Sequence, residues 1–244
     1  VTVVVEAAPI AATPDAPAPV TGSTGGDDII NALANDTLNG TPVAIANVAV
    51  TVTAPATPVT SGAPIPVLDP ATGLVDVPAG TPAGTYTIGY QICETLNPSN
   101  CATSTVTVVV DAAPIAAAPD MPPAVNGATG NPAVTNAFTN DMLNGVPVTP
   151  ATITATVTTP ASNPGVVLDP ATGNVSVAPG TPAGTYTISY QICETLNPSN
   201  CANSAVTVVV DAAPIAATND DAGTVPGISG GQNLVNALVN DSLN

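Results

Sequence analysis

The sequence predicts an all-β protein made of tandem β-sandwich domains, and three observations support this prediction. Valine, isoleucine and threonine recur throughout the chain, and their branched side chains favour pleated strands. Twenty glycines and 28 prolines supply frequent turns between those strands. Long segments also return almost unchanged after 105 and then after another 100 residues, which is the length of a domain and not of one solenoid coil.

The repetition covers strand-like, linker-like and turn-like segments. In the longest pair, residues 81–101 and 181–201, the only difference is Gly89 against Ser189. Because the same segments return in the same order, each repeat is predicted to be one structural unit. The shorter repeated segments are residues 1–5, 106–110 and 206–210, and residues 7–12, 112–117 and 212–217.

The repeats divide the chain into two complete domains and two fragments. The chain opens inside a valine-rich strand and ends after the opening strands of a further domain. The five-residue difference in spacing falls in a loop, where a change of length costs little. The predicted parts are residues 1–8 (last strand and linker of a preceding repeat), 9–110, 111–210 and 211–244 (opening strands of a further repeat).

About seven short strands fit into each repeat, as an immunoglobulin-like sandwich with Greek-key connections requires. Turn residues separate them, most clearly at Asn39-Gly40 and over residues 69–73 and 78–84. Residues 29–33 are either a strand or a short helical turn, and no other helix is predicted. In the first repeat the predicted strands are residues 9–12, 28–33, 45–53, 65–68, 74–77, 85–93 and 104–110.

One predicted strand in each repeat alternates large apolar residues with polar or small ones. Successive side chains of a strand point to opposite faces, so the apolar set should line the core. Tyr86, at the start of this strand, is either a tyrosine corner that bonds nearby backbone or a plain core residue. The predicted core set is Tyr86, Ile88, Tyr90 and Ile92, with Tyr186, Ile188, Tyr190 and Ile192.

The four cysteines form two pairs with the same spacing, Cys93 with Cys101 and Cys193 with Cys201. Each pair flanks a turn-rich loop, so a disulfide across the tip of a hairpin is predicted. The alternative is metal binding by two thiolates, which needs two further ligands in a chain without histidine. A disulfide implies an oxidising, extracellular or cell-surface location.

The chain holds 17 acidic residues and no lysine, arginine or histidine, so its formal net charge is −17. Such a polyanion cannot neutralise phosphates, which argues against nucleic-acid binding and against docking on anionic lipid. The usual catalytic bases, Schiff-base lysines and oxyanion clamps are missing, and the chain is predicted not to be an enzyme. No apolar run is long enough for a membrane helix, and no cofactor is required.

Acidic residues recur where one repeat ends and the next begins. Calcium prefers six to eight oxygen ligands, and carboxylates at these junctions could supply some of them. The alternative is that these residues bond their own backbone in turns. The candidate calcium ligands are Asp111, Asp120, Asp211, Asp220 and Asp221.

Residues 68–73 and 80–86, together with residues 90–101, resemble the immunoglobulin-like and cadherin-like repeats of large bacterial cell-surface, adhesin-type proteins. Residues 216–221 and 238–241 are similar to the start of the calcium-linked members. The resemblance implies an extracellular location and a structural or adhesive role, without specifying a ligand.

Two functions follow as hypotheses. In the first, the repeats form a rigid stalk or filament shaft whose partner is the chain itself, as neighbouring repeats or as subunits joined by strand complementation. In the second, loops at the ends of the sandwiches form an adhesin module with multivalent binding to carbohydrate or protein. A saturable ligand for one isolated repeat would distinguish the second hypothesis from the first.

Overall fold

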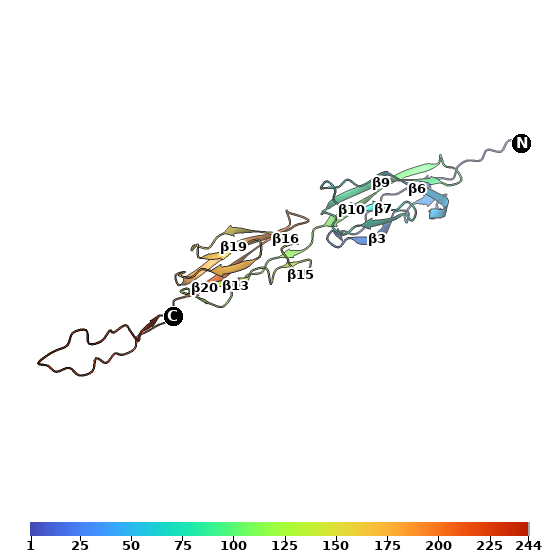
Figure 1. The fold of residues 1–244 in the computed structure, drawn as a ribbon. Coiled ribbons are helices and arrows are strands. Elements are labelled where there is room, and N and C mark those ends of the chain that lie inside the picture. The colour runs from blue at the N-terminus through green and yellow to red at the C-terminus, as the bar shows by residue number, and fades with distance from the viewer. Residues whose placement is uncertain (244) are drawn as a thin grey trace. The chain divides into compact units, whose positions relative to one another are not determined.

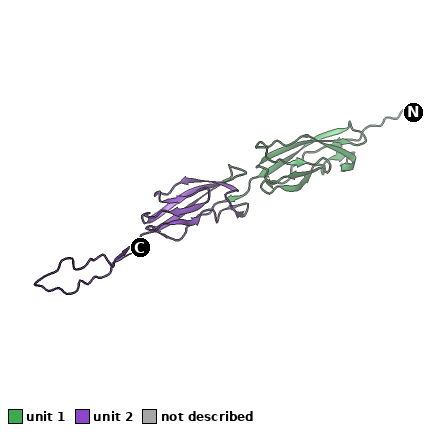
Figure 2. Ribbon diagram, viewed as in Figure 1, with its two compact units in different colours: residues 1–115, 143–145, 193–201 green, residues 116–142, 146–192, 202–244 purple. Residues whose placement is uncertain are grey.

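The computed structural model describes residues 1–243, which form β-strands joined by turns and loops (Figure 1). Over this range there is no α-helix, and one short 3₁₀ turn, Ile45–Asn47, precedes a strand. The chain forms two compact units (Figure 2). The first comprises Val1–Ile115, Leu143–Gly145 and Cys193–Cys201, and the second comprises Ala116–Met142, Val146–Ile192 and the chain from Ala202 onward.

Ten strands belong to the first repeat, and two of them, β9 and β10, are much longer than the others. Their bounds are β1 Ile10–Ala11, β2 Val20–Thr21, β3 Gly26–Asn31, β4 Thr37–Leu38, β5 Thr41–Pro42, β6 Val48–Ala54, β7 Val67–Leu68, β8 Leu74–Val77, β9 Gly84–Glu94 and β10 Cys101–Asp111. They form two main sheets of order β2-β10-β9-β6 and β3-β8-β7, with a small sheet β1-β4-β5. Between the two main sheets the chain crosses after β2, after β3 by way of β4 and β5, after β6 and after β8, which is the Greek-key pattern of a sandwich.

The second repeat reproduces this order as sheets β12-β20-β19-β16, β13-β18-β17 and β11-β14-β15. Its strands are β11 Ile115–Ala116, β12 Val125–Asn126, β13 Asn131–Asn136, β14 Met142–Leu143, β15 Val146–Pro147, β16 Ile153–Thr159, β17 Val166–Leu168, β18 Asn174–Val177, β19 Gly184–Glu194 and β20 Cys201–Asp211. After it come β21 Ile215–Ala216 and β22 Ser242–Leu243, which pair with each other and are exposed.

The antiparallel β9–β10 hairpin forms the centre of the first sandwich. Its register runs without a break from the Cys93–Cys101 pair to the Gly84–Val110 pair. Threonines on β9 alternate with buried tyrosines and isoleucines, so one face of the hairpin meets the core and the other meets solvent. The side chains predicted to point inward are all buried: Tyr86, Ile88, Tyr90, Ile92, Tyr186, Ile188, Tyr190 and Ile192.

The opening segment of each repeat lies parallel to its last long strand. Val20 pairs with Val110 in the first repeat, as Val125 pairs with Val210 in the second. Gly22 follows this contact, and a β-carbon there would lie 1.9 Å from the Thr81 carbonyl oxygen. Only glycine therefore allows the backbone at this position to lie so close to the Thr81 carbonyl oxygen.

Most predicted strand boundaries differ from the structure by one to three residues, and local hydrogen bonds explain two of these differences. The strand predicted from residue 45 begins only at Val48, because the Asn47 N–H bonds the Ala44 carbonyl in the preceding 3₁₀ turn. The strand predicted to reach residue 33 ends at Asn31, whose side-chain oxygen accepts the Leu33 N–H at 2.9 Å. Such a local bond competes with the sheet ladder.

Three short strands of the first repeat were not predicted. Strands β4 and β5 flank Asn39-Gly40, where φ is 53° and 72°, so the predicted turn is a left-handed hairpin turn. Strand β2 is also only two residues long. Two residues are too few to show a periodicity of two, so the alternation of side chains could not predict these strands.

Replacing Tyr86 with phenylalanine tests how the start of β9 is held. The hydroxyl of Tyr86 donates to the Pro82 carbonyl at 2.7 Å, the geometry of a tyrosine corner, and burial raises the pKa of this hydroxyl. Tyr86→Phe leaves that acceptor without its partner and should destabilise the first repeat by about 1 kcal/mol in urea unfolding. The control Thr87→Val changes an exposed hydroxyl on the same strand and should cost less than about 0.5 kcal/mol. Equal losses in the two variants would contradict this account.

Candidate functional site

Each complete repeat brings two aspartates together around one buried tyrosine hydroxyl, and of the four aspartates only Asp120 is partly exposed. In the first repeat, Asp15 comes from the opening segment, Asp36 from the loop after β3, and Tyr90 from the middle of β9. Asp36 and Tyr90 are 0% exposed and Asp15 is 5% exposed. The Tyr90 hydroxyl lies 3.1 Å from Asp36 Oδ2 and 3.3 Å from Asp15 Oδ2. We call these three residues the carboxylate–tyrosine cluster of the first repeat.

Backbone bonds place both carboxylates. The Asp36 carboxylate accepts the Thr13 N–H at 2.7 Å, which ties the opening segment to the loop after β3. The backbone of Asp15 bonds both ways with β10, since its N–H donates to Thr105 O at 3.0 Å and its carbonyl accepts from Thr107 N at 2.9 Å. The cluster therefore lies where the first and last segments of the repeat meet.

The second repeat holds an equivalent cluster of Asp120, Asp141 and Tyr190. Tyr190 lies 3.0 Å from Asp141 Oδ2, and Asp141 Oδ1 accepts the Ala118 N–H at 2.7 Å. Oδ2 of Asp120 is buried and has no hydrogen-bond partner. This cluster therefore has one acceptor more than its donors can satisfy.

Burial dominates the electrostatics of both clusters. Burial first, and then the neighbouring Asp36 charge, raise the pKa of Asp15 to about 6, while hydrogen bonds from Tyr90 and Asn35 oppose the rise. Burial and Asp141 raise the pKa of Asp120 to about 6 in the same way. The pKa values of Asp36, Asp141 and both tyrosine hydroxyls are also raised, first by burial.

The structure separates the candidate calcium ligands. Asp111 and Asp211 are the exposed last residues of β10 and β20, whereas Asp120 belongs to the buried cluster. Asp220 and Asp221 are exposed. Among residues 1–243, no three acidic side chains gather closely enough to hold a metal ion. The buried clusters also do not fit resident calcium, because N–H and O–H groups point at their carboxylates. Calcium at the junctions stays a prediction.

Both cysteine pairs are disulfides, Cys93–Cys101 and Cys193–Cys201, each with its Cα atoms 4.1 Å apart. Cys93 and Cys101 face each other in the β9–β10 register, where paired strands bring the backbones within bridging reach. No cysteine is left in the described chain for the alternative of thiolate metal binding.

The tip of each long hairpin also binds the linker that precedes its repeat. The Asn100 amide donates to the Ala8 carbonyl at 2.6 Å and to Glu94 Oε2 at 2.9 Å. Hydrogen bonds from Asn100 and Asn97 lower the pKa of Glu94. At the second tip, Asn200 makes the same two bonds, to the Ala113 carbonyl and to Glu194.

The sequence predicted junction or turn roles for recurring aspartates such as Asp120 and a core position for Tyr90. It did not bring the cluster together, since no spacing rule joins residues 15, 36 and 90 in one place. A usable signal is present: acidic residues recur in register in a repeat that has no cation to pair with them. The linker contact of Asn100 was missed entirely.

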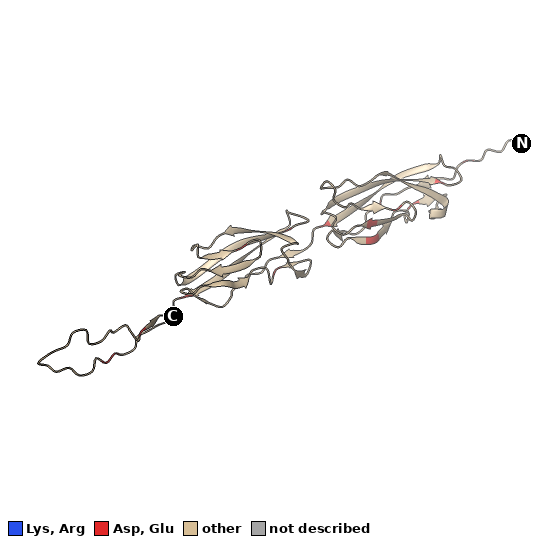
Figure 3. Ribbon diagram, viewed as in Figure 1, with Lys and Arg blue, Asp and Glu red and all other residues tan. Residues whose placement is uncertain are grey.

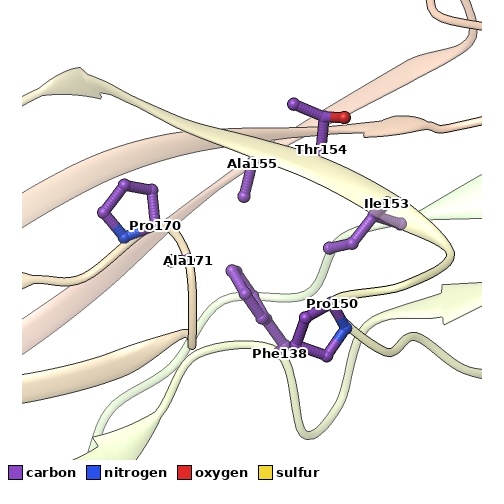
Figure 4. A pocket seen from close by; sticks show the side chains of 7 residues that line it. All are labelled: Phe138, Pro150, Ile153, Thr154, Ala155, Pro170 and Ala171. Carbon is purple, nitrogen blue, oxygen red and sulfur yellow. The ribbon is translucent and has the colours of Figure 1, made fainter.

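Three grooves in the second unit carry no ionisable side chain. One, of about 390 Å³, lies beside Phe138, and Figure 4 shows Ile153 and Ala155 pointing toward Phe138 while Thr154 points to the other side of β16. The other two are lined by apolar and amide or hydroxyl side chains. Asp15 and Asp36 line none of these three grooves, nor a fourth groove in the first unit. Figure 3 shows acidic residues as scattered short segments, with no lysine or arginine.

No protein-family model matches the chain, and no curated protein matches it. Solved structures of cadherin ectodomains match it weakly. "Protocadherin Gamma B2 extracellular cadherin domains 3-6" aligns with 12% identity and a TM-score of 0.35, over 83% of this chain and 49% of that one. Mouse Cadherin-23 EC22-24 aligns with 11% identity and a TM-score of 0.34, over 82% of this chain and 62% of that one. The human Desmocollin-1 ectodomain aligns with 11% identity and a TM-score of 0.29, over 84% of this chain and 42% of that one.

These likenesses carry no functional argument, and the fold rests on the strand order and register described above. The chain spans about half or less of the protocadherin and desmocollin chains. A search of residues 1–243 finds no helix long and apolar enough to cross a membrane.

Removing one disulfide tests how much the hairpin depends on it. The double change Cys93→Ala and Cys101→Ala opens a short loop and should destabilise the first repeat by about 2.5 kcal/mol in urea unfolding, because the unfolded chain regains loop entropy. Treating the wild-type protein with a reductant should lower the unfolding midpoint of both repeats, whereas the variant should respond only in its second repeat. Reductant-insensitive unfolding of the wild type would contradict a stabilising role.

Proposed function

We propose that this segment is part of an extracellular bacterial surface stalk or filament, in which the repeats act as structural units that associate with copies of themselves. One observation carries the proposal: two complete sandwiches follow one another, and each has its own core, its own hairpin disulfide and its own closure of first strand on last. A chain of such self-contained units can be extended by repetition alone.

The chemistry of the chain supports a mechanical role outside the cell. Disulfides persist in oxidising compartments. The paired carboxylates of the first repeat lie in its core, and the three grooves described in the second unit hold no ionisable group. The absence of lysine and arginine also leaves trypsin-like proteases no cleavage site, which suits an exposed surface protein.

The contacts at the linker support a stiff connection. Ala113 is only 1% exposed, and both its backbone groups are bonded. Its N–H donates to Glu194 at 3.3 Å and its carbonyl accepts from Asn200 at 2.6 Å. Pro114 follows directly and restricts φ. A linker held in this way has lost the freedom of a flexible tether.

The free edge of the larger sheet is where copies of the chain could join. Strand β6 ends the sheet order β2-β10-β9-β6, and β16 ends its counterpart. Each edge strand has seven residues with no charge and no proline, and neither carries the lysines that usually block edge pairing. Addition of a strand from another molecule at this edge is the strand complementation that we propose.

A second candidate function is adhesion through the hairpin tip. Leu96 at the first tip is 86% exposed, although it is a large apolar side chain. It borders a groove of about 350 Å³ that also includes Leu38, Ala46 and Glu94. This groove with its exposed leucine is the surface that we propose for a protein partner, and tandem repetition would make weak binding multivalent.

Sedimentation velocity of the 244-residue chain tests edge association. We expect concentration-dependent oligomers, and the edge variant Thr51→Asp with Thr156→Asp should remove them because like charges then face each other at both edges. The control Thr87→Asp with Thr187→Asp adds the same charge to inner strands and should leave association intact. A strict monomer at high concentration would sink the self-association proposal, and equal loss in both variants would show that net charge alone is responsible.

A further inference from the structure

The carboxylate–tyrosine clusters contain more acceptors than hydrogens. The Tyr90 hydroxyl has one hydrogen, yet oxygens of Ala32, Asp36 and Asp15 lie 2.9 Å, 3.1 Å and 3.3 Å from it. One hydroxyl hydrogen can serve only one of them well. With both aspartates ionised, two negative charges would share a buried site that no cation reaches.

The second repeat shows the same deficit independently. Asp120 Oδ2 is buried without any partner, while Tyr190 lies 3.0 Å from both Asp141 Oδ2 and the Ala137 carbonyl. A proton on either carboxyl group would supply the missing donor. Two carboxylates at close quarters commonly retain one proton between them for this reason.

The opening strands of the third repeat provide a comparison within the chain. Asp241 still accepts the Thr218 N–H at 2.8 Å, as Asp36 accepts that of Thr13. Asp220, the counterpart of Asp15, is exposed in the residues described. The local turn alone therefore does not bury the aspartate pair.

We propose that each complete repeat binds one proton shared by its two buried aspartates, and that this proton latches the opening segment of the repeat onto its last strand. Asp15 belongs to the opening segment, and its backbone pairs with Thr105 and Thr107 of β10. Asp36 accepts the Thr13 N–H of the same opening segment. A proton between the two carboxylates would therefore hold the opening segment on β10. The repeats should therefore be most stable against unfolding at mildly acidic pH.

The direction of the pH effect follows from linkage. The pKa of Asp15 is raised from 3.8 to about 6 in the folded repeat, first by burial and then by Asp36. The folded state therefore binds more protons than the unfolded state between these two values, and stability rises as pH falls through that window. Asp36 and Tyr90 are the titratable groups that face Asp15 from the neighbouring elements. The chain has no basic side chain to reverse the trend.

The test compares urea unfolding at about pH 7.5 and about pH 4.5 in the wild type and in Asp15→Asn with Asp120→Asn. Asparagine supplies the donor permanently, so this variant should unfold at a higher urea midpoint than the wild type at neutral pH. On acidification its midpoint should rise much less than that of the wild type. The control Asp111→Asn with Asp211→Asn removes two exposed carboxylates, and its urea midpoint should rise on acidification as much as that of the wild type. This control separates the latch from general relief of charge repulsion.

Two further measurements keep the proposal testable if the variant folds poorly. Carbon-13 NMR of the wild-type carboxyl groups should show Asp15 titrating near pH 6. Hydrogen exchange at the Asp15 and Thr107 amides, corrected for the intrinsic pH effect, should slow on acidification. Titration of both aspartates at the ordinary 3.8, or an undiminished rise in the asparagine variant, would overturn the proposal. Stabilisation by calcium at neutral pH that disappears in that variant would also overturn it, since the pair would then hold a metal ion.

Discussion

The absence of any cationic side chain is the constraint on which the rest of the structure depends. A buried carboxylate is normally paired with lysine, arginine or histidine, but this chain offers none. Each repeat instead bonds its buried acids to neutral donors, which in the first repeat are a tyrosine hydroxyl and a backbone N–H for Asp36 and an asparagine amide for Glu94. Hydrogen bonds to a charge are stronger than neutral ones, yet they do not cancel it. Burial of these charges, with the Asp36 charge as a second cause at Asp15, therefore raises the pKa values inside the clusters.

The long hairpin joins these buried acids, the linker and the opening segment of the repeat in one structural unit. Its middle carries Tyr90, its tip carries Glu94 and the disulfide, and its last residues receive the opening segment of the repeat. The same two strands therefore build the core, hold the linker and close the sandwich. Near-identity of residues 81–101 and 181–201 covers most of this hairpin. A change there would disturb packing, linker and closure together, which gives the repeated segment a physical reason to stay unchanged.

The sequence predicted most of the fold because the repeat period and the alternation along β9 are both strong signals. Strand β8 was placed at its observed bounds, and the inward tyrosines and isoleucines are buried. Predictions failed where side chains compete with the ladder, as at Asn31, and where strands of two residues show no period. The carboxylate–tyrosine clusters were out of reach, because they join residues 54 and 75 positions apart through the folded topology alone.

The same lack of lysine affects how copies of the chain meet. Natural edge strands are commonly guarded by lysine, proline or short length, and β6 and β16 have none of these. What remains to oppose pairing is the net charge of −17, a diffuse repulsion that salt screens beyond about 10 Å at 0.1 M. Acid weakens this repulsion and, through the proposed proton, tightens each repeat. Mild acidity would therefore favour both the folded repeat and the assembly of repeats, so the two processes share one control although they occur at different places in the sandwich.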